Sequence, residues 1–409
     1  MPKRKKDLKK PFSGLRVADF SWVGVGPTVG KYLADFGADV IRIESGQRPE
    51  TLRFAGPMAT PEPDLDGSGY YANFNSSKRC ASIDLHHPDG PEMARRLVGK
   101  SDVVLESFAP GAMERRGLTY EVLAENRDDL VMMSLPLFGQ TGPWAPWRGY
   151  GHTLQAAAGF NHLTGWPDEP PIGTGIAYTD FLAPHFATFA LVAALDYRRR
   201  TGKGQYIDFS QQEGSIHALG PAILEWTANG REMERLGNRD PEAAPHGCYK
   251  CKDGKWVVVA CFTEKQWEGF RAALGRPDWC DLERMRRKWQ RMNEQKEIDW
   301  HVSAWCQEFT AGQVMKRMQE FGVPSGVVKT AEDMHRDPQM KHRKHYVTLE
   351  HPVMGARTYD SPAFKLSKTP HELTGPAPLL GQHTEEVFRE VVGMSAEEFA
   401  AASAGGVFK

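Results

Sequence analysis

Short apolar runs alternate with stretches of helical periodicity through the first half of the chain. Consecutive apolar positions are typical of strands buried on both faces, and strands that alternate with helices indicate a parallel sheet. The expected strands are 15–20, 39–44, 102–106, 130–134 and 205–210, and the expected helices are 28–36, 91–100, 118–126 and 181–200. The pattern predicts an open α/β sheet with helices on both faces and an active site at the carboxyl ends of its strands.

The length and composition of the chain predict how it divides into domains. With 409 residues it exceeds the size at which one hydrophobic core usually stops growing, so we expect one large and one small domain. The passage 138–175 is rich in Gly and Pro and reads as a functional loop, with a substrate channel as its role. The expected parts are a basic, mobile tail at 1–10, a large domain at 11–224, a small domain at 225–326 and a return segment at 327–409.

Charge and composition exclude several classes of function. The chain has 51 basic and 52 acidic side chains, so no net positive field favours nucleic acid. No run of eighteen uncharged apolar residues spans a membrane, and no apolar stretch follows the basic tail as in a secretory signal. Six irregularly spaced cysteines suit reduced thiols. We therefore expect a cytoplasmic protein that binds neither membrane nor nucleic acid.

A glycine turn offers one possible ligand site. Gly24, Gly26 and Gly30, with Glu44 ending the next strand, are similar to a dinucleotide fingerprint, which would mean a nicotinamide oxidoreductase. Val29 stands at the usual third glycine, however, and Pro27 would stiffen the turn. A tight turn at 24–27 that supports a different ligand is the favoured interpretation.

Cysteine and histidine give weaker signals. Cys248 and Cys251 have the spacing of half a zinc site, but no second half lies near them, so we predict buried thiols and no metal. Several histidines lie in or near the functional-looking regions, and any that faced a cleft could act as a general base. They are His152, His185, His217 and His246.

Asp180 is the carboxylate of most interest. It stands between the loop 173–178 and an almost uncharged helix. An Asp in this place can cap the helix by accepting hydrogen bonds from its first amides. The alternative is that it is a catalytic nucleophile, and its position alone leaves both interpretations open.

Several motifs carry a resemblance that extends from Pro11 onward. They are 15–20 with Gly26-Pro27, the run 37–44, Lys78-Arg79 six residues before Asp84-Leu85, the run 138–143, Asp180 before its helix, and 201–205. In their order and spacing the chain resembles the class III CoA-transferases, the family of formyl-CoA and carnitine CoA-transferases.

The resemblance implies a fold, an assembly and a set of site residues. It implies a Rossmann-like large domain with an open parallel sheet, a smaller α+β domain, and chains interlocked as a dimer of one or two kinds of subunit. Asp180 matches the family nucleophile, and Lys78, Phe108 and Arg115 match positions that contact CoA, with Arg116 beside them. A coenzyme A thioester is then a substrate, and no permanently bound cofactor is expected.

The chemistry of CoA transfer explains why the nucleophile is a carboxylate. Attack of a carboxylate on an acyl-CoA expels the CoA thiolate and leaves a mixed anhydride, whose energy is close to that of the thioester. The thiolate can then form an aspartyl-CoA thioester, from which an acceptor acid takes CoA. Water must be excluded because an anhydride hydrolyses readily.

Some positions depart from the family pattern. The usual Asn-Phe-Arg-Pro-Gly turn is here 107–111, where Ser and Ala replace Asn and Arg, and Gly24 stands where some members have Gln. Pro136-Leu137 replaces a common Ser-Gly. These changes leave open that the chain is a partner subunit of a heteromeric enzyme.

A 2-methylacyl-CoA racemase is a further alternative. Racemases of this family have a His between Gly and Asp where this chain has Tyr150 between two glycines, although His152 lies two residues on. The favoured reading is a transferase with a succinyl-CoA donor and a bulky, benzylsuccinate-like acceptor. The acceptor is suggested by Trp144, Trp147 and Trp166 in or beside the loop segment.

Overall fold

The computed structural model describes residues 10–59 and 61–409. The expected tail at 1–10 lies outside these residues except for Lys10. The chain forms two compact units: the larger comprises the described residues up to Asn161 with Gly173–Glu232 and Gln339–Lys409, and the smaller comprises His162–Ile172 and Met233–Pro338. The domain limits expected from composition, 225–326 and 327–409, stay predictions beside these boundaries.

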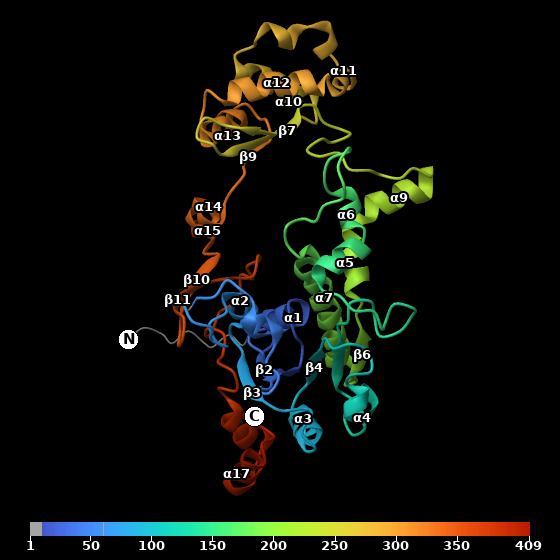
Figure 1. The fold of residues 1–409 in the computed structure, drawn as a ribbon, viewed down its shortest axis with the longest axis vertical. Coiled ribbons are helices and arrows are strands. Elements are labelled where there is room, and N and C mark those ends of the chain that lie inside the picture. Colours follow the sequence, from blue (N-terminus) through green and yellow to red (C-terminus); the bar gives the residue numbers. More distant parts are fainter. Residues whose placement is uncertain (1–9, 60) are drawn as a thin grey trace. The chain divides into compact units, whose positions relative to one another are not determined.

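A six-stranded sheet forms the centre of the larger unit (Figure 1). Its order is β3-β2-β1-β4-β5-β6, and every neighbouring pair is parallel. The strands are β1 (Arg16–Asp19), β2 (Asp39–Glu44), β3 (Arg79–Ser82), β4 (Val103–Glu106), β5 (Val131–Ser134) and β6 (Gln205–Asp208). The predicted α/β class and five of these strands are confirmed, whereas β3 was not predicted.

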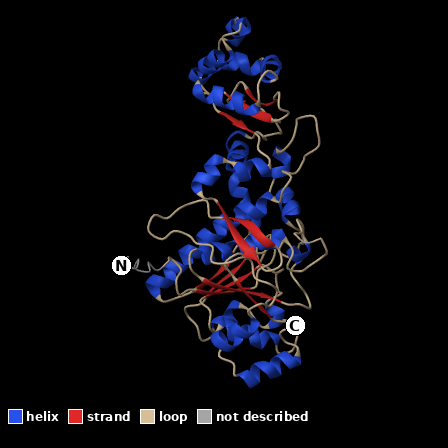
Figure 2. Ribbon diagram, turned by 90° about the vertical axis from the view of Figure 1, so that its left-hand side faces the viewer, coloured by secondary structure: helices blue, strands red, loops and turns tan. Residues whose placement is uncertain are grey.

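Helices cover both faces of this sheet (Figure 2). Alternate strand residues point to opposite faces, so Val17 and Val131 pack with α1 and α7, while Ala18 and Met132 pack with α3 and the C-terminal segment. The helices of the larger unit are α1 (Val25–Asp35), α2 (Gly69–Asn75), α3 (Gly90–Val98), α4 (Tyr120–Ala124), α5 (Gly151–Ala157), α6 (Phe160–Leu163, which runs into the smaller unit), α7 (Tyr178–Thr201), α8 (Gln211–Ile216), α9 (Gly220–Asn229), α15 (Pro338–Arg343), α16 (Thr384–Glu386) and α17 (Ala396–Gly405).

The predicted turn at 24–27 is wrong, because α1 begins at Val25. Pro27 is tolerated there since the first amides of a helix have no partner within the helix. Gly26 is required by packing: a Cβ at this position would lie 2.2 Å from the Cβ of Ser21. Glycine and proline therefore begin this helix rather than interrupt it.

The predicted loop at 138–175 is wrong in part, because it contains α5 and α6. The following helix, α7, begins at Tyr178 rather than Phe181 and places Asp180 in its first turn. By length and composition α7 could span a bilayer, but it packs against α1, α5 and α8.

The smaller unit has its own core and an antiparallel sheet of β7 (His246–Lys250), β8 (Trp256–Ala260) and β9 (Ser325–Val327). Its helices are α10 (Glu264–Leu274), α11 (Lys288–Asn293), α12 (Gln295–Cys306), α13 (Ala311–Glu320) and α14 (Ala331–Arg336). In the larger unit, the return of the chain adds a hairpin of β10 (Tyr346–His351) and β11 (Gly355–Asp360).

Candidate active site

Asp180 lies buried in the first turn of α7, between two glycines. Asp180 is 7% exposed to solvent. A Cβ at Gly24, the residue before α1, would lie 3.2 Å from the Cβ of Asp180, and a Cβ at Gly151, the first residue of α5, would lie 2.4 Å from its Oδ1. The absence of side chains at these two positions leaves room for the carboxylate.

The electrostatics of Asp180 differ from those of an ordinary ion pair. Burial raises its pKa to about 6, and the opposing effects come from His152 and the Thr179 hydroxyl rather than from Lys or Arg. The residue that precedes α7 as its N-cap is Ala177, so Asp180 does not occupy the capping position. A carboxylate that is desolvated yet mostly ionised at neutral pH can act as a nucleophile.

A pocket of about 260 Å³ lies at the carboxyl ends of β3, β2, β1 and β4. In a sheet of this order, ligands bind where the strand order reverses, between β1 and β4. The structure brings three of the predicted CoA residues, Phe108, Arg115 and Arg116, together in the pocket lining. The Phe108 ring meets that of Trp22 edge to face at 5.9 Å, which gives the pocket an aromatic wall.

Three arginines, Arg48, Arg115 and Arg116, surround this pocket and are here called the arginine cluster. His86 Nε2 accepts from Arg48 Nη1 at 3.2 Å and from Arg116 Nη2 at 3.1 Å. Among the described residues, none of the three forms an ion pair with a carboxylate within 4.0 Å. Partial burial and repulsion by Arg115 and Arg48 lower the pKa of Arg116. Unbalanced guanidinium groups at a pocket are suited to an anionic ligand.

Lys78 does not line this pocket. Its side chain is fully buried, and its ammonium donates to Asp19 Oδ2 at 3.0 Å, to the Pro27 carbonyl at 2.8 Å and to Asn75 Oδ1 at 3.0 Å. All three donors are thus occupied by the protein. Lys78 belongs to a group of buried, paired charges that we call the buried network, whose other members are Asp19, Arg42, Glu44, Glu50 and Arg53.

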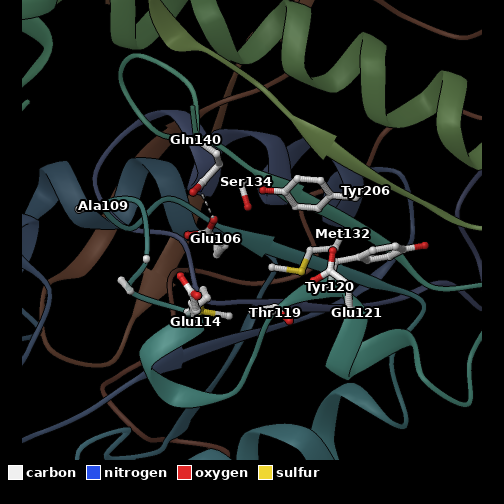
Figure 3. Close-up of a pocket in the computed structure, with 13 residues that line it drawn as sticks. Glu106, Ala109, Glu114, Thr119, Tyr120, Glu121, Met132, Ser134, Gln140 and Tyr206 are labelled. Carbon is white, nitrogen blue, oxygen red and sulfur yellow. Dashed lines mark hydrogen bonds between the residues drawn. The ribbon is translucent and has the colours of Figure 1, made fainter. Parts of the chain in front are cut away.

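A second pocket, of about 290 Å³, lies beside the first, at the ends of β4, β5 and β6 (Figure 3). Glu106 points into it, accepting from the Phe108 amide at 2.8 Å and from Gln140 Nε2 at 3.2 Å. Burial raises the pKa of Glu106 to about 7. Glu114 and Glu121 also line this pocket. Its acidic lining repels phosphate, so the pocket of the arginine cluster is the better place for a phosphorylated ligand.

The other predicted candidates are dispersed. Of the histidines, His152 adjoins Asp180, whereas His185 contacts Tyr32, His217 stacks on Phe186, and His246 lies in the smaller unit. Trp144 and Trp147 stack on each other at 5.0 Å, and Trp166 belongs to the smaller unit. Cys251 is buried beside Cys306. In the described ranges, no group of three or more His, Cys, Asp or Glu side chains could hold a metal ion.

Sequence reasoning missed Arg48 and His86. They follow β2 and β3, and neither stands in a recognisable motif. The available signal was topological, because residues that follow parallel strands gather at one edge of the sheet. For His86 that signal needs β3, which was not predicted, and Arg48 is recognised only together with His86.

The six-stranded parallel sheet, the pocket where its strand order reverses and the buried carboxylate are the layout of an α/β enzyme. The sequence matches the model of CoA-transferase family III over residues 12–384, and the chain therefore belongs to this family. This finding replaces the oxidoreductase alternative.

Named relatives agree with the family match. The chain is 33% identical to succinyl-CoA–D-citramalate CoA-transferase of Chloroflexus aurantiacus, over 96% of each chain. It is 32% identical to the alpha subunit of succinyl-CoA–L-malate CoA-transferase of Chloroflexus aurantiacus, over 95% of this chain and 90% of the relative. A solved structure of a CaiB/BaiF family protein from Brucella suis matches 94% of this chain and all of its own with a TM-score of 0.86, at 29% identity.

Proposed function

We propose that this CoA-transferase moves CoA from succinyl-CoA to a dicarboxylic acid, with Asp180 as the nucleophile. The observation that carries the proposal is the geometry of Asp180, a buried carboxylate that lies between two glycines and has no Lys or Arg partner among residues 10–59 and 61–409. A structural carboxylate buried to this degree is usually paired with a cation. An unpaired one with a raised pKa indicates a reactive group.

The reaction runs through two anhydrides and one enzyme thioester. A carboxylate oxygen of Asp180 attacks the thioester carbon, the carbon–sulfur bond breaks, and CoA leaves as a thiolate. The thiolate attacks the aspartyl carbon of the anhydride and releases succinate. The acceptor carboxylate then attacks the aspartyl-CoA thioester, and the thiolate it expels attacks the acceptor carbonyl. The products are acceptor-CoA and the regenerated Asp180 carboxylate.

Two features of the site favour these steps. Burial raises the pKa of Asp180 to about 6, so the group is ionised at pH 7 but is less stabilised by water than an ordinary Asp. Gly24 is the N-cap of α1 and lies against Asp180, so the positive end of that helix dipole faces the reacting group. A negative charge that develops on the carbonyl oxygen is stabilised there.

The pocket at the switch point is the proposed site of the nucleotide end of CoA. Phe108 offers an apolar face to the adenine, and Arg115 and Arg116 supply charge for the phosphates, with Arg48 as an addition to the predicted set. A direct contact of Lys78 with CoA remains a prediction. Because its ammonium is fully occupied by protein acceptors, we assign Lys78 a supporting place behind the pocket.

The substrate assignment rests on the relatives. Both named relatives from Chloroflexus aurantiacus carry succinyl-CoA and a dicarboxylic acid in their names. Benzylsuccinate is also a dicarboxylic acid, so the expected bulky acceptor stays within the same class. A panel of L-malate, citramalate and benzylsuccinate, with butyrate as the matched acid that lacks the second carboxylate, tests the class. Transfer to butyrate at the rate of the dicarboxylates would reject it.

We infer that the chain works as a dimer, of one or two kinds of subunit. Phe189 on α7 is 76% exposed, and Leu224 and Trp226 on α9 are 66% and 59% exposed. Large exposed apolar side chains of this kind are typical of an assembly surface. Light scattering of the purified chain measures its mass, and a monomer that is inactive until a homologous chain is added would favour the partner-subunit alternative. The cytoplasmic location stays a prediction.

The deciding experiment traps the acyl-enzyme. The protein is incubated with succinyl-CoA and hydroxylamine, and peptides are analysed by mass spectrometry for a hydroxamate at Asp180. We expect this adduct in the wild-type chain and its absence in D180N. CoA binding without any adduct would reject Asp180 as the nucleophile. Deuterium exchange into 2-methylacyl-CoA without an acceptor acid would instead support the racemase.

A further inference from the structure

Val23 has a backbone conformation that a valine rarely adopts. Its φ is +66°, in the left-handed region, where a β-branched side chain is strained. The residue lies between the end of β1 and the start of α1 and directly precedes Gly24, at which a Cβ would lie 3.2 Å from the Cβ of Asp180. Strained backbone next to a reactive group persists when the surrounding structure holds it in place.

The turn Ser21–Gly24 is held by hydrogen bonds at three consecutive residues. Arg42 Nη1 donates to the Ser21 carbonyl at 2.8 Å. Ser107 Oγ accepts from the Trp22 amide at 2.8 Å and lies 3.1 Å from the Trp22 carbonyl oxygen, to which it donates. The Val23 amide donates to Glu50 Oε1 at 2.6 Å. The bond from Val23 is the one that acts on the strained residue itself.

Glu50 is fully buried and belongs to the buried network. One oxygen of its carboxylate accepts from Arg42 and the other accepts from Val23. Burial raises the pKa of Glu50 to about 7, and Glu44 adds to this rise while Arg42 opposes it, so the carboxylate is mainly charged above pH 7. In that form it accepts a stronger bond from a backbone amide than a neutral acceptor does. Arg42 in turn bonds to Ser21, so the Arg42–Glu50 pair holds the turn at two points. The reaction described above makes no direct use of this carboxylate.

We propose that Glu50 is a positioning residue for acyl transfer, which holds Val23 in the left-handed conformation and thereby keeps Gly24 and the start of α1 against Asp180. This inference rests on the proposed function of Asp180. Without the bond to Glu50, Val23 relaxes toward negative φ, and Gly24 moves with it. The nucleotide end of CoA is bound elsewhere, at the arginine cluster, so positioning of the reacting groups suffers more than binding does.

The test is a rescue experiment. E50Q retains the shape of the side chain but offers one acceptor oxygen, for which the Arg42 guanidinium competes with the Val23 amide. We expect E50Q to lower kcat by roughly ten- to a hundredfold and to change the acyl-CoA KM by less than about threefold. Adding V23G recovers most of that kcat, because glycine adopts positive φ without being held.

V23A is the matched control for V23G. Both substitutions remove the valine methyl groups that pack against the cluster around Leu52 and Tyr71, but alanine keeps its Cβ and the penalty for positive φ. The E50Q/V23A protein therefore keeps the low kcat of E50Q. Equal rescue by alanine and glycine, or an E50Q protein with wild-type kcat, would overturn the proposal.

Folding and the nucleophile are tested separately. Thermal unfolding shows whether E50Q is folded at the assay temperature, and if it is not, E50D, which keeps the charge on a side chain one methylene shorter, takes its place in the same rescue series. The assays use an acyl-CoA and acid that the wild-type chain converts. A wrong nucleophile appears as a missing Asp180 adduct in the wild-type chain, whereas a wrong role for Glu50 appears only in the variants.

Discussion

Two groups of charged residues lie in the larger unit, and they differ in how their charges are balanced. In the buried network, Lys78 Nζ lies 3.0 Å from Asp19 Oδ2. Arg42 Nε lies 2.9 Å from Glu44 Oε1, and Arg42 Nη2 forms an ion pair with Glu50 Oε2. In the arginine cluster, Arg48 and Arg116 share one acceptor, the Nε2 atom of His86. The acidic and basic side chains of the network neutralise one another, whereas the arginines of the cluster have no carboxylate partner among the described residues and can bind an anionic ligand.

Burial explains the difference. A charge removed from water must be paired, because its desolvation costs several kcal/mol, whereas exposed arginines on the rim of a pocket retain water until a ligand displaces it. Asp180 belongs to neither group, since it is buried like the network and unpaired like the cluster. A substitution should therefore affect folding in the network, binding in the cluster, and catalysis at Asp180.

The largest expected effect is the loss of turnover in D180N. The amide cannot form the anhydride, so we expect kcat to fall by at least about a thousandfold. CoA affinity, measured by calorimetry, should change little, because the proposed site of the nucleotide end is the arginine cluster and not Asp180. D180N with more than a tenth of the wild-type kcat would remove Asp180 from its proposed role.

The same variant should be more stable than the wild-type chain above pH 6. The pKa of Asp180 is raised in the folded protein from 3.8 to about 6, so its contribution to stability is full below pH 4 and is lost as the pH rises through 6. Because D180N has no carboxyl group at this position, it does not lose this stability, which amounts to about 2 to 3 kcal/mol. Urea unfolding at pH 4 and pH 8 tests the sign: the two proteins should agree at the lower pH and differ at the higher.

The second prediction tests the network. K78M removes the cation but leaves Asp19 fully buried, and we expect a loss of about 3 kcal/mol in the free energy of unfolding. The control is R115A, in the arginine cluster, which should unfold like the wild-type chain. A K78M protein of normal stability but with weak CoA binding would move Lys78 from the network to the ligand site.

Lys78 also shows what sequence can and cannot predict. Its resemblance to a CoA-contacting position is a matter of chain order, which does not say whether the ammonium points into the pocket or toward Asp19. The strands were predictable because continuous apolar runs are typical of buried parallel strands. The strand β3, Arg-Cys-Ala-Ser, was missed because it contains no β-branched residue, although it lies beside β2 in the sheet.

The site was predictable only where residues stand in recognisable motifs. Asp180, Phe108, Arg115 and Arg116 stand in or near such motifs and could be proposed as candidates from the sequence. Glu50 and Arg48 lie in an irregular stretch after β2, and their partners, Val23 and His86, are more than twenty residues away. Contacts of that kind depend on how the strands are ordered in the sheet, which the sequence pattern does not give.

The third prediction concerns the space around the nucleophile. A methyl group at position 151 would lie 2.4 Å from Asp180 Oδ1 and 2.5 Å from the Cβ of Ala177, so G151A must displace the carboxylate or the start of α7 that carries it. We expect kcat to fall by roughly a hundredfold with CoA affinity unchanged. G312A is the matched control, because a Cβ at that helical glycine has no neighbour within 4 Å. Equal kcat in both variants would show that the carboxylate tolerates displacement.

The smallest expected effects are those of the arginine cluster. R48A, R115A and R116A should each weaken CoA binding by about tenfold without altering the free energy of unfolding, because no internal carboxylate loses its partner. Arg116 is fixed by its bond to the Ala112 carbonyl at 2.7 Å and so loses less side-chain freedom when it binds. R116A should therefore weaken binding more than R115A does.

Calorimetry with CoA and with dephospho-CoA then identifies which arginine contacts the ribose phosphate, because the affinity difference between the two ligands disappears in that variant. If no single variant removes that difference, the cluster does not bind the ribose phosphate.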